Sequence, residues 1–269
     1  MIKHLSYSSI NLYLTCARAW RFRYIDKVKT PVAAVLPFGS AFHDAIEYYI
    51  GSKTLGEPSP ADKIFADSWQ KQLEREQQID FGTETPESLA DLGQRMLGSE
   101  LDVTGGGPNR KVRNASTFLN DIVPMMNGST PVIEKKITLM VPGVEVPIIG
   151  YIDLITSDGV PCDFKTSAKS WYAAKAHEEM QPTFYLAALT QEGIAPDDFR
   201  FRYYIFVKTK KPKAQIIETK RTPAQLFWLL EMIREVWDGI RAGVFPPTGP
   251  GSWKCSKKYC EFWGMCRGK

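Results

Sequence analysis

The chain has 269 residues, of which 43% are hydrophobic and 24% are charged, so wholesale disorder is excluded and one large or two small folded domains are expected. No apolar run approaches the roughly 18–20 residues that span a bilayer, and the N-terminus lacks the charged and apolar regions of a secretory signal. We therefore expect a cytoplasmic protein without membrane contact.

The net charge of +4 is unevenly distributed along the chain. Residues 1–29 carry six Lys and Arg against one acid, and residues 199–269 carry fifteen against five, so the middle of the chain is acidic. Basic ends around a carboxylate-rich middle are typical of a protein that binds a polyanion and has a metal centre. Charge alone leaves a second interpretation open, namely two solvated basic faces without a specific ligand.

The first half of the chain is predicted to be mainly helical. A helix over 6–24 can begin at a serine cap, and a second helix over 40–50 is expected to end at Gly51. Residues 51–128 are acidic, with weak periodicity and a glycine-rich break at 105–108. We interpret this segment as a mainly helical insertion.

The pattern changes to strands after residue 131. Strands are expected over 132–140, 146–156, 160–165, 201–207 and 215–219, and helices over 170–180, 181–192 and 223–243. The tail over 245–269 is rich in Pro and Gly and too short to bury a core of its own. This order of elements predicts one α/β or α+β domain over 1–269 that carries a helical insertion.

Two carboxylates and a lysine lie on neighbouring predicted strands. Asp163 and Lys165 are two residues apart on one strand, so they point to the same face and Phe164 points to the other. Asp153 lies among apolar residues of the preceding strand, where an unpaired carboxylate is costly to bury. A divalent cation would offset the repulsion of the two acids, while Lys165 would neutralise charge on a phosphate. A cross-strand ion pair at a sheet edge is the alternative.

Three of the five cysteines, Cys255, Cys260 and Cys266, lie in the last fifteen residues with the spacing C-x4-C-x5-C. They are one thiolate short of a four-ligand site, which Cys16 is the candidate to complete. Four thiolates suit a structural zinc or an iron–sulfur cluster better than a disulfide framework, although the C-x2-C knuckles of common zinc sites are missing. Cys162, on a buried strand, is expected to pack in the core.

These residues together resemble the PD-(D/E)XK nuclease superfamily, in particular its RecB-like exonuclease branch. In that branch a Gly-x-x-Asp strand precedes an Asp-x-Lys strand, as Gly150–Asp153 precedes Asp163–Lys165 here. The segment Phe38–His43 resembles the helix-borne histidine motif of the family, and Gln181–Tyr185 resembles its Gln-x-x-x-Tyr motif. With the opening helix and Cys16 included, the matches reach from residue 5 to 266 and leave 51–128 uncovered.

The resemblance implies a restriction-endonuclease-like α/β core, in which helices flank a central mixed sheet. It also implies a [4Fe–4S] cluster on Cys16, Cys255, Cys260 and Cys266, similar to that of phage and CRISPR-associated iron–sulfur exonucleases. Such a cluster would join the tail over 245–269 to the first helix. A structural zinc in the same place is the alternative.

The resemblance further implies a metal-dependent DNA exonuclease. Its Mg²⁺ or Mn²⁺ would be held by His43, Asp153, Asp163 and the backbone carbonyl of Phe164, and Lys165 would help to activate the attacking water. Gln181 and Tyr185 would contact the scissile strand, and Glu134, on the strand before Asp153, is a further candidate at this site. Each assignment has a plainer alternative, such as a hydrogen bond from His43 to Glu47 one helical turn away.

The expected substrate is single-stranded DNA or DNA ends in a bacterial, archaeal or phage-infected cell, with a recombination, repair or CRISPR adaptation protein as partner. Basic residues that could follow the DNA backbone are Arg21, Arg23, Lys208, Lys210, Lys211 and Lys213, and aromatic residues that could stack on bases are Tyr24, Trp171 and Tyr204. Two alternative functions are a nucleic-acid-binding assembly module that works through a partner, and a sequence-specific endonuclease of the same fold.

Overall fold

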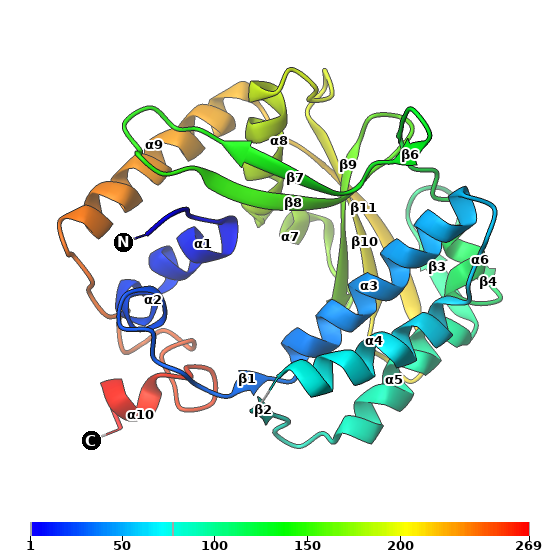
Figure 1. Cartoon of the computed structure of the whole chain (residues 1–269), viewed down its shortest axis with the longest axis horizontal. Helices are drawn as coiled ribbons and strands as arrows, with labels where there is room; N and C mark the ends of the chain where they lie inside the picture. Colours follow the sequence, from blue (N-terminus) through cyan, green and yellow to red (C-terminus); the bar gives the residue numbers. More distant parts are fainter. Residues whose placement is uncertain (1, 77, 269) are drawn as a thin grey trace. The chain divides into compact units, whose positions relative to one another are not determined.

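The computed structural model describes residues 2–76 and 78–268, which form two compact units (Figure 1). The first unit comprises the chain up to Pro31, Ile137–Gly150 and the chain from Thr222 onward, and the second comprises Val32–Lys136 and Tyr151–Arg221. Within the described residues, no helix has both the length and the apolar character that a membrane span needs.

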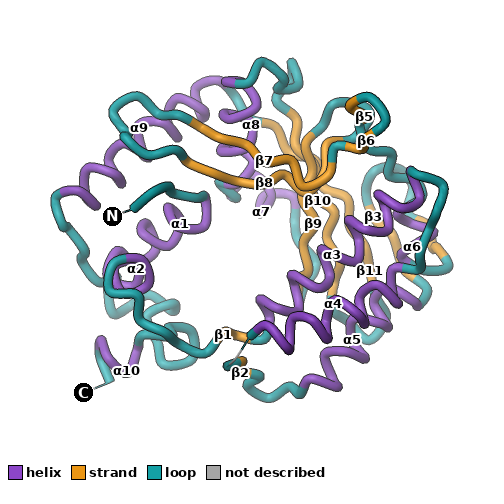
Figure 2. Tube along the Cα trace, viewed as in Figure 1, coloured by secondary structure: helices purple, strands orange, loops and turns teal. Residues whose placement is uncertain are grey.

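A mixed sheet in the order β4-β3-β11-β10-β9-β8-β7 organises the second unit (Figure 2). Its strands are β3 (Leu101–Thr104), β4 (Arg110–Val112), β7 (Ile133–Leu139), β8 (Ile148–Ile155), β9 (Pro161–Ser167), β10 (Arg200–Val207) and β11 (Lys213–Lys220). Neighbours β9 and β10 are parallel, as are β3 and β11, whereas β10 and β11 form an antiparallel hairpin. The expected mixed sheet is therefore confirmed, and β7 and β8 continue along the chain into the first unit.

Four helices bury their apolar residues in a common core with strands of this sheet. They are α3 (Val35–Thr54), α4 (Ala61–Arg75), α5 (Pro86–Gly98) and α6 (Ala115–Leu119). Phe42 of α3 lies edge-on against Phe206 of β10, with ring centroids 5.1 Å apart, and Phe118 of α6 packs against the same ring. Phe164 belongs to this core, as does Cys162, so the sequence-based expectation for Cys162 is confirmed.

The helices α7 (Ala173–Glu178) and α8 (Gln181–Gln191) contact residues of the same sheet other than those in this core. The Tyr185 ring of α8 packs on Phe201 of β10, and His177 of α7 lies 2.9 Å from the hydroxyl of Thr219 on β11. Because side chains alternate along β9, Asp163 and Lys165 lie opposite the core residues Cys162 and Phe164.

The first unit contains α1 (Tyr7–Thr15), α2 (Ala17–Tyr24), α9 (Pro223–Arg241) and α10 (Trp263–Cys266). A reciprocal capping box at Ser6 starts α1, and another at Thr222, followed by Pro223, starts α9, as the sequence predicts. Trp20 of α2 is fully buried and stacks on Phe245 of the tail at 5.7 Å. Short strand pairs complete the chain, namely β1 (Val32–Ala33) with β2 (Ile79–Asp80), and β5 (Met126–Asn127) with β6 (Thr130–Pro131).

Three local predictions differ from the structure. The helix expected over 6–24 is broken at Cys16, whose extended backbone (φ −162°, ψ 100°) ends α1 and precedes α2. The helix expected over 40–50 begins earlier and continues through Gly51, because Lys53 anchors its last turn by donating to three carbonyls of the 119–122 segment. The 51–128 segment also supplies β3 and β4 to the sheet, through pairing with a strand more than 100 residues away that local sequence does not reveal.

Candidate functional site

The strands β8 and β9 bring together the two aspartates and the lysine that the sequence singles out. Lys165 Nζ lies 2.6 Å from Asp163 Oδ2, and the backbone N–H of Phe164 donates to Asp153 Oδ2 over 2.7 Å. Asp153 and Asp163 are 6% and 1% exposed, so neither carboxylate is a solvated surface group. The alternative of an ion pair at an exposed sheet edge is therefore excluded.

Helix α3 supplies the remaining candidate metal ligands. His43 Nδ1 lies 3.4 Å from Asp153 Oδ2 and 3.9 Å from Glu47 Oε1, and one ligand atom from each of the three residues lies within 4.8 Å of the other two. Glu47 Oε1 is buried and has no hydrogen-bond partner. From the sequence, Glu47 is expected only as a hydrogen-bond partner of His43 one helical turn away, and its place among the ligands is a finding of the structure.

Glu134 of β7 adds a further carboxylate beside Glu47. Glu134 lies close enough to raise the pKa of Glu47, and both side chains line a cavity of about 450 Å³ that also contacts His43. Glu134 has a left-handed backbone with φ +50°, which a residue with a Cβ adopts only where its surroundings hold it.

The crowding of acids at this site shifts its protonation equilibria. Burial in the first place, and then the nearby carboxylates of Asp153 and Glu134, together raise the pKa of Glu47 to about 10. Burial, followed by the charge of Asp163, also raises the pKa of Asp153 well above its usual value. Without a cation, the site therefore holds protons that isolated carboxyl groups would release at neutral pH.

His43 and Lys165 respond to the same surroundings in opposite directions. Burial lowers the pKa of His43, which keeps the imidazole neutral and able to bind a metal. Burial also lowers the pKa of Lys165, but the charges of Asp163 and Asp153 raise it by more, so the ammonium stays charged.

The first turn of α8 places Gln181 and Tyr185 beside Asp163. Gln181 Nε2 lies 2.8 Å from Asp163 Oδ1 and 2.9 Å from Tyr185 Oη, and both side chains are almost fully buried. This geometry excludes the alternative in which the two residues form an ordinary surface pair. Burial raises the pKa of Tyr185, so its phenol remains protonated and able to donate.

The residues present fit a divalent cation. One neutral imidazole and two carboxylates converge, one carboxylate oxygen lacks a hydrogen-bond partner, and carboxylate-rich ligation suits Mg²⁺ or Mn²⁺. Asp163, a predicted ligand, has one oxygen on Lys165 and the other on Gln181. That Asp163 and the backbone carbonyl of Phe164 also bind the metal stays a prediction.

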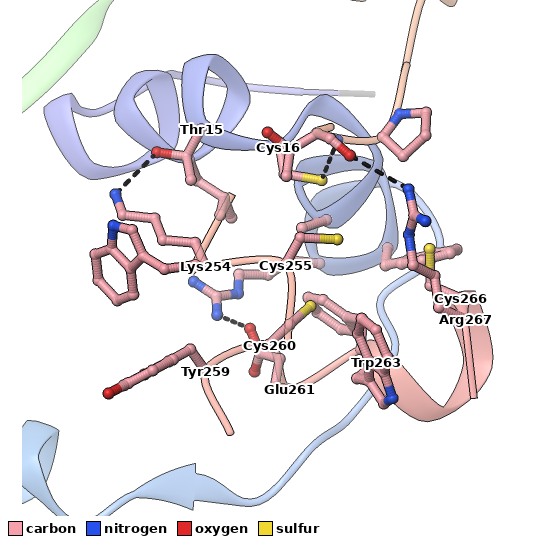
Figure 3. A pocket seen from close by; sticks show the side chains of 18 of the residues that line it. Thr15, Cys16, Lys254, Cys255, Tyr259, Cys260, Glu261, Trp263, Cys266 and Arg267 are labelled. Carbon is pink, nitrogen blue, oxygen red and sulfur yellow. Dashed lines mark hydrogen bonds and ion pairs between the residues drawn. The ribbon is translucent and has the colours of Figure 1, made fainter. Parts of the chain in front are cut away.

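In the first unit, Cys16, Cys255, Cys260 and Cys266 line a single cavity of about 430 Å³ (Figure 3). The break between α1 and α2 exposes Cys16 to this cavity, and the backbone N–H of Thr248 lies 3.4 Å from its sulfur. Burial raises the pKa of Cys260, and so does the proximity of the other three thiols. The pairing of one N-terminal cysteine with three from the tail is therefore present in the fold.

The four sulfurs are not arranged as the ligands of one zinc ion are. Four thiolates on one zinc, each at about 2.3 Å, lie about 3.8 Å from one another. Among the described residues, no three of these Sγ atoms lie within 4.8 Å of one another. As they stand, the four side chains therefore do not form a tetrahedral zinc site.

Several residues predicted to contact DNA are positioned differently. Trp171 and Tyr204 are 9% and 4% exposed and pack in the protein interior, so their predicted role in base stacking is wrong. Arg21 pairs with Asp26 and Arg23 with Glu261, which leaves them less free for phosphate. The loop between β10 and β11 carries Lys208, Lys210 and Lys211, and Lys213 is the first residue of β11. None of these four lysines has a carboxylate partner within the described parts of the chain, and the ammonium of Lys208 lies 4.8 Å from the centre of the Phe38 ring.

Comparison with known proteins places these observations in a family. The sequence model described as "PD-(D/E)XK nuclease superfamily" matches residues 4–267. Among solved structures, a Eubacterium rectale protein named "Putative exonuclease" is similar, with a TM-score of 0.54, 11% sequence identity, and coverage of 96% of this chain and 87% of that one. The comparison with curated proteins finds no match.

Proposed function

This chain belongs to the PD-(D/E)XK nuclease superfamily, and we propose that it is a divalent-metal-dependent deoxyribonuclease that acts as an exonuclease on single-stranded DNA or DNA ends. The observation that carries the proposal is the convergence of the His43, Glu47 and Asp153 ligand atoms next to the Asp163–Lys165 pair. All five residues belong to the second unit and are supplied by α3, β8 and β9.

We assign the metal to His43, Glu47 and Asp153, with Glu134 close to Glu47. A bound Mg²⁺ or Mn²⁺ would lower the pKa of a coordinated water and offset the charge that develops on a phosphate. The chain itself fixes the ligands, because the N–H of Phe164 orients Asp153 and the helical spacing holds His43 and Glu47 on one face.

The remaining polar residues orient the reacting groups. Lys165 keeps its proton at neutral pH, so it acts as a fixed cation that orients a water or neutralises a phosphoryl oxygen. Asp163 holds the Lys165 ammonium through one oxygen, and Gln181 holds Asp163 through the other. Tyr185 bonds the Gln181 amide and completes this buried chain of contacts.

The lysine-rich loop supports a nucleic-acid substrate. The backbone N–H of Lys208 donates to the carbonyl of Ser167, which is two residues beyond Lys165 on β9. At about 3.3 Å of rise per residue, the loop begins within about 10 Å of Lys165 along the strand. The lysines of this loop therefore lie where they can bind phosphates on one side of the scissile bond.

For the cysteine cavity we propose a [4Fe–4S] cluster that stabilises the first unit. The four thiols that line one cavity support a metal centre here, and the absence of C-x2-C knuckles from the sequence favours a cluster over a zinc ion. Such a centre would contribute folding energy by joining the tail to the α1–α2 break, and it would take no part in phosphodiester hydrolysis.

Digestion of end-labelled DNA tests the proposed activity. We expect protein purified without oxygen to shorten labelled single- or double-stranded DNA from an end in Mn²⁺ or Mg²⁺, and to leave it intact in EDTA. Asp163→Ala and Lys165→Ala should abolish cleavage while DNA binding persists. Internal cuts at fixed sites would indicate an endonuclease, and binding without cleavage under all conditions would indicate an assembly module.

Iron and zinc analysis of the same preparation tests the cluster. We expect about four iron atoms per chain and a broad absorbance near 400 nm. One zinc and no iron would replace the cluster by a structural zinc, and a metal-free protein of full stability would exclude both.

A further inference from the structure

Arg221 is a buried cation whose hydrogen bonds end on neutral groups. It directly follows β11, is 4% exposed, and has no carboxylate within ion-pair distance in the described residues. Its five N–H donors all have acceptors at 2.6–3.1 Å, and these are the hydroxyls of Thr183 and Thr219 and the carbonyls of Ala176, Glu179 and Lys220. Burial lowers the pKa of this guanidinium. Burial of a charged guanidinium without a carboxylate partner costs free energy, so the position of Arg221 needs an explanation.

The acceptors show which elements the guanidinium joins. Ala176 and Glu179 offer carbonyls from the last turn of α7 and the residue that follows it, and Thr183 lies in the first turn of α8. The connection between the two helices is only two residues long. The first helical residue of α8 is Gln181, and no side chain caps this helix end. Arg221 therefore ties the end of α7 and the start of α8 together by donating to both sides of the connection.

We propose that Arg221 is a positioning residue for the active site, which sets the place of Gln181 and, through it, the orientation of Asp163 and Lys165. This inference rests on the nuclease function proposed above. Gln181 Nε2 reaches Asp163 Oδ1 over 2.8 Å, and the other oxygen of Asp163 holds Lys165 over 2.6 Å. A shift of the first turn of α8 would lengthen the first of these contacts. The hydrogen bonds of Arg221 end on Thr183, Thr219 and backbone carbonyls, and none of them is to Asp163 or Lys165.

The experiment compares Arg221→Lys with the matched control Arg202→Lys. Lysine keeps the charge but loses the planar fork that reaches both helices. Arg202 also uses its fork, on Asp158 and Glu218, which lie on neither α7 nor α8. We expect Arg221→Lys to lower kcat by about tenfold or more while KM and Mn²⁺ binding stay unchanged, because small displacements at an active site are costly. Arg202→Lys should change kcat less than about twofold, because the contacts that it loses do not involve α7 or α8.

A double-mutant cycle distinguishes positioning from general destabilisation. In a Gln181→Met background, Arg221→Lys should lower kcat by less than about twofold further, because the contact through which it acts is already lost. Wild-type kcat in Arg221→Lys, or an equal loss in both backgrounds, would overturn the proposal. If Arg221→Lys does not fold, Thr183→Val removes one acceptor of the guanidinium and should give a smaller loss that is also absent in the Gln181→Met background. Wild-type kcat in Thr183→Val would then overturn the proposal.

Hydrogen exchange provides a readout that does not depend on activity. Amides of residues 176–186 should exchange faster in Arg221→Lys than in the wild type, and those of α3 should not change. Unchanged exchange over 176–186 would overturn the proposed role of Arg221. Absence of cleavage by the wild type would instead overturn the nuclease function, and the exchange result would still decide whether Arg221 holds α8.

Discussion

Replacement of Glu47 by glutamine should make the stability of the metal-free protein less dependent on pH. The side chain of Glu47 is 13% exposed, and its pKa is raised from 4.5 to about 10 by burial and by the carboxylates of Asp153 and Glu134. Between these two values the folded protein keeps a proton that the unfolded chain releases. The stabilising contribution of this proton is therefore fully present below pH 4.5 and is lost as the pH rises towards 10.

The pH dependence of the free energy of unfolding through Glu47 is limited by the single proton that Glu47 can bind. A full proton difference changes the free energy of unfolding by about 1.4 kcal/mol per pH unit, so the wild type should lose at most about 2.7 kcal/mol between pH 6 and pH 8 through Glu47. Glu47→Gln cannot ionise, so this proton difference is absent from the variant. The variant should therefore become more stable relative to the wild type as the pH rises.

Urea unfolding at pH 6 and pH 8, in buffer treated with a chelator of divalent cations, measures this difference. The exposed Glu74 of α4 provides the control, because Glu74→Gln should shift stability equally at both pH values. Saturating Mn²⁺ should stabilise the wild type more at pH 8 than at pH 6, since the cation competes with the proton, and should stabilise Glu47→Gln much less. A difference between Glu47→Gln and the wild type that is the same at both pH values would refute the assignment of a buried, proton-holding carboxylate.

Three further predictions test other parts of the molecule. Cys16→Ser should remove bound iron, lower the Tm and expose the tail to protease. The control Cys162→Ala should leave the iron content unchanged. Iron retained by Cys16→Ser would argue against the four-thiol centre. Replacing Lys208, Lys210, Lys211 and Lys213 by Gln should reduce the slope of log Kd against log salt for single-stranded DNA by about 3, at about 0.7 per phosphate contact, with Lys111→Gln as the control that keeps the slope. Gly93→Ala places a Cβ 2.0 Å from the Phe65 ring, so we expect urea unfolding to show a loss of about 1–3 kcal/mol in the free energy of unfolding. The control Gly39→Ala meets nothing within 4 Å and should raise the free energy of unfolding by up to about 1 kcal/mol. Equal effects of the two variants would contradict the packing of α4 on α5.

The strands and the long C-terminal helix could be predicted because their signals are local. Alternation along β9 places Asp163 and Lys165 on one face, and the cap at Thr222 with Pro223 marks the start of α9. The break at Cys16 was not predictable, because the residues on both sides favour a continuous helix and the extended cysteine carries no sequence mark such as Gly or Pro. The structure explains the break by the place of its thiol in the cysteine cavity.

The metal site could be predicted only in part, because its ligands come from distant segments. The family motifs indicate His43 and Asp153, which are 110 residues apart, but nothing in the spacing shows that Glu47 joins them. Glu47 is separable from an ordinary helical carboxylate only by its burial and its lack of a hydrogen-bond partner. Arg221 is missed for a similar reason, since its role depends on five acceptors that the fold collects from α7, α8 and β11.

Glu134 links the backbone of the site to its charge. A backbone φ of +50° costs a residue with a Cβ about 1–3 kcal/mol and persists only where its surroundings determine it. The sequence shows no Gly or Asn at this position of β7 that would mark the unusual backbone. This conformation accompanies a carboxyl contact with Glu47, which is already crowded by Asp153. Backbone strain and carboxylate crowding therefore occur at the same place, and a cation between the carboxylates would reduce their repulsion most directly. It follows that metal binding should stabilise β7 and α3 together, and that the metal-free protein should lose hydrogen-exchange protection first around Glu134 and Glu47.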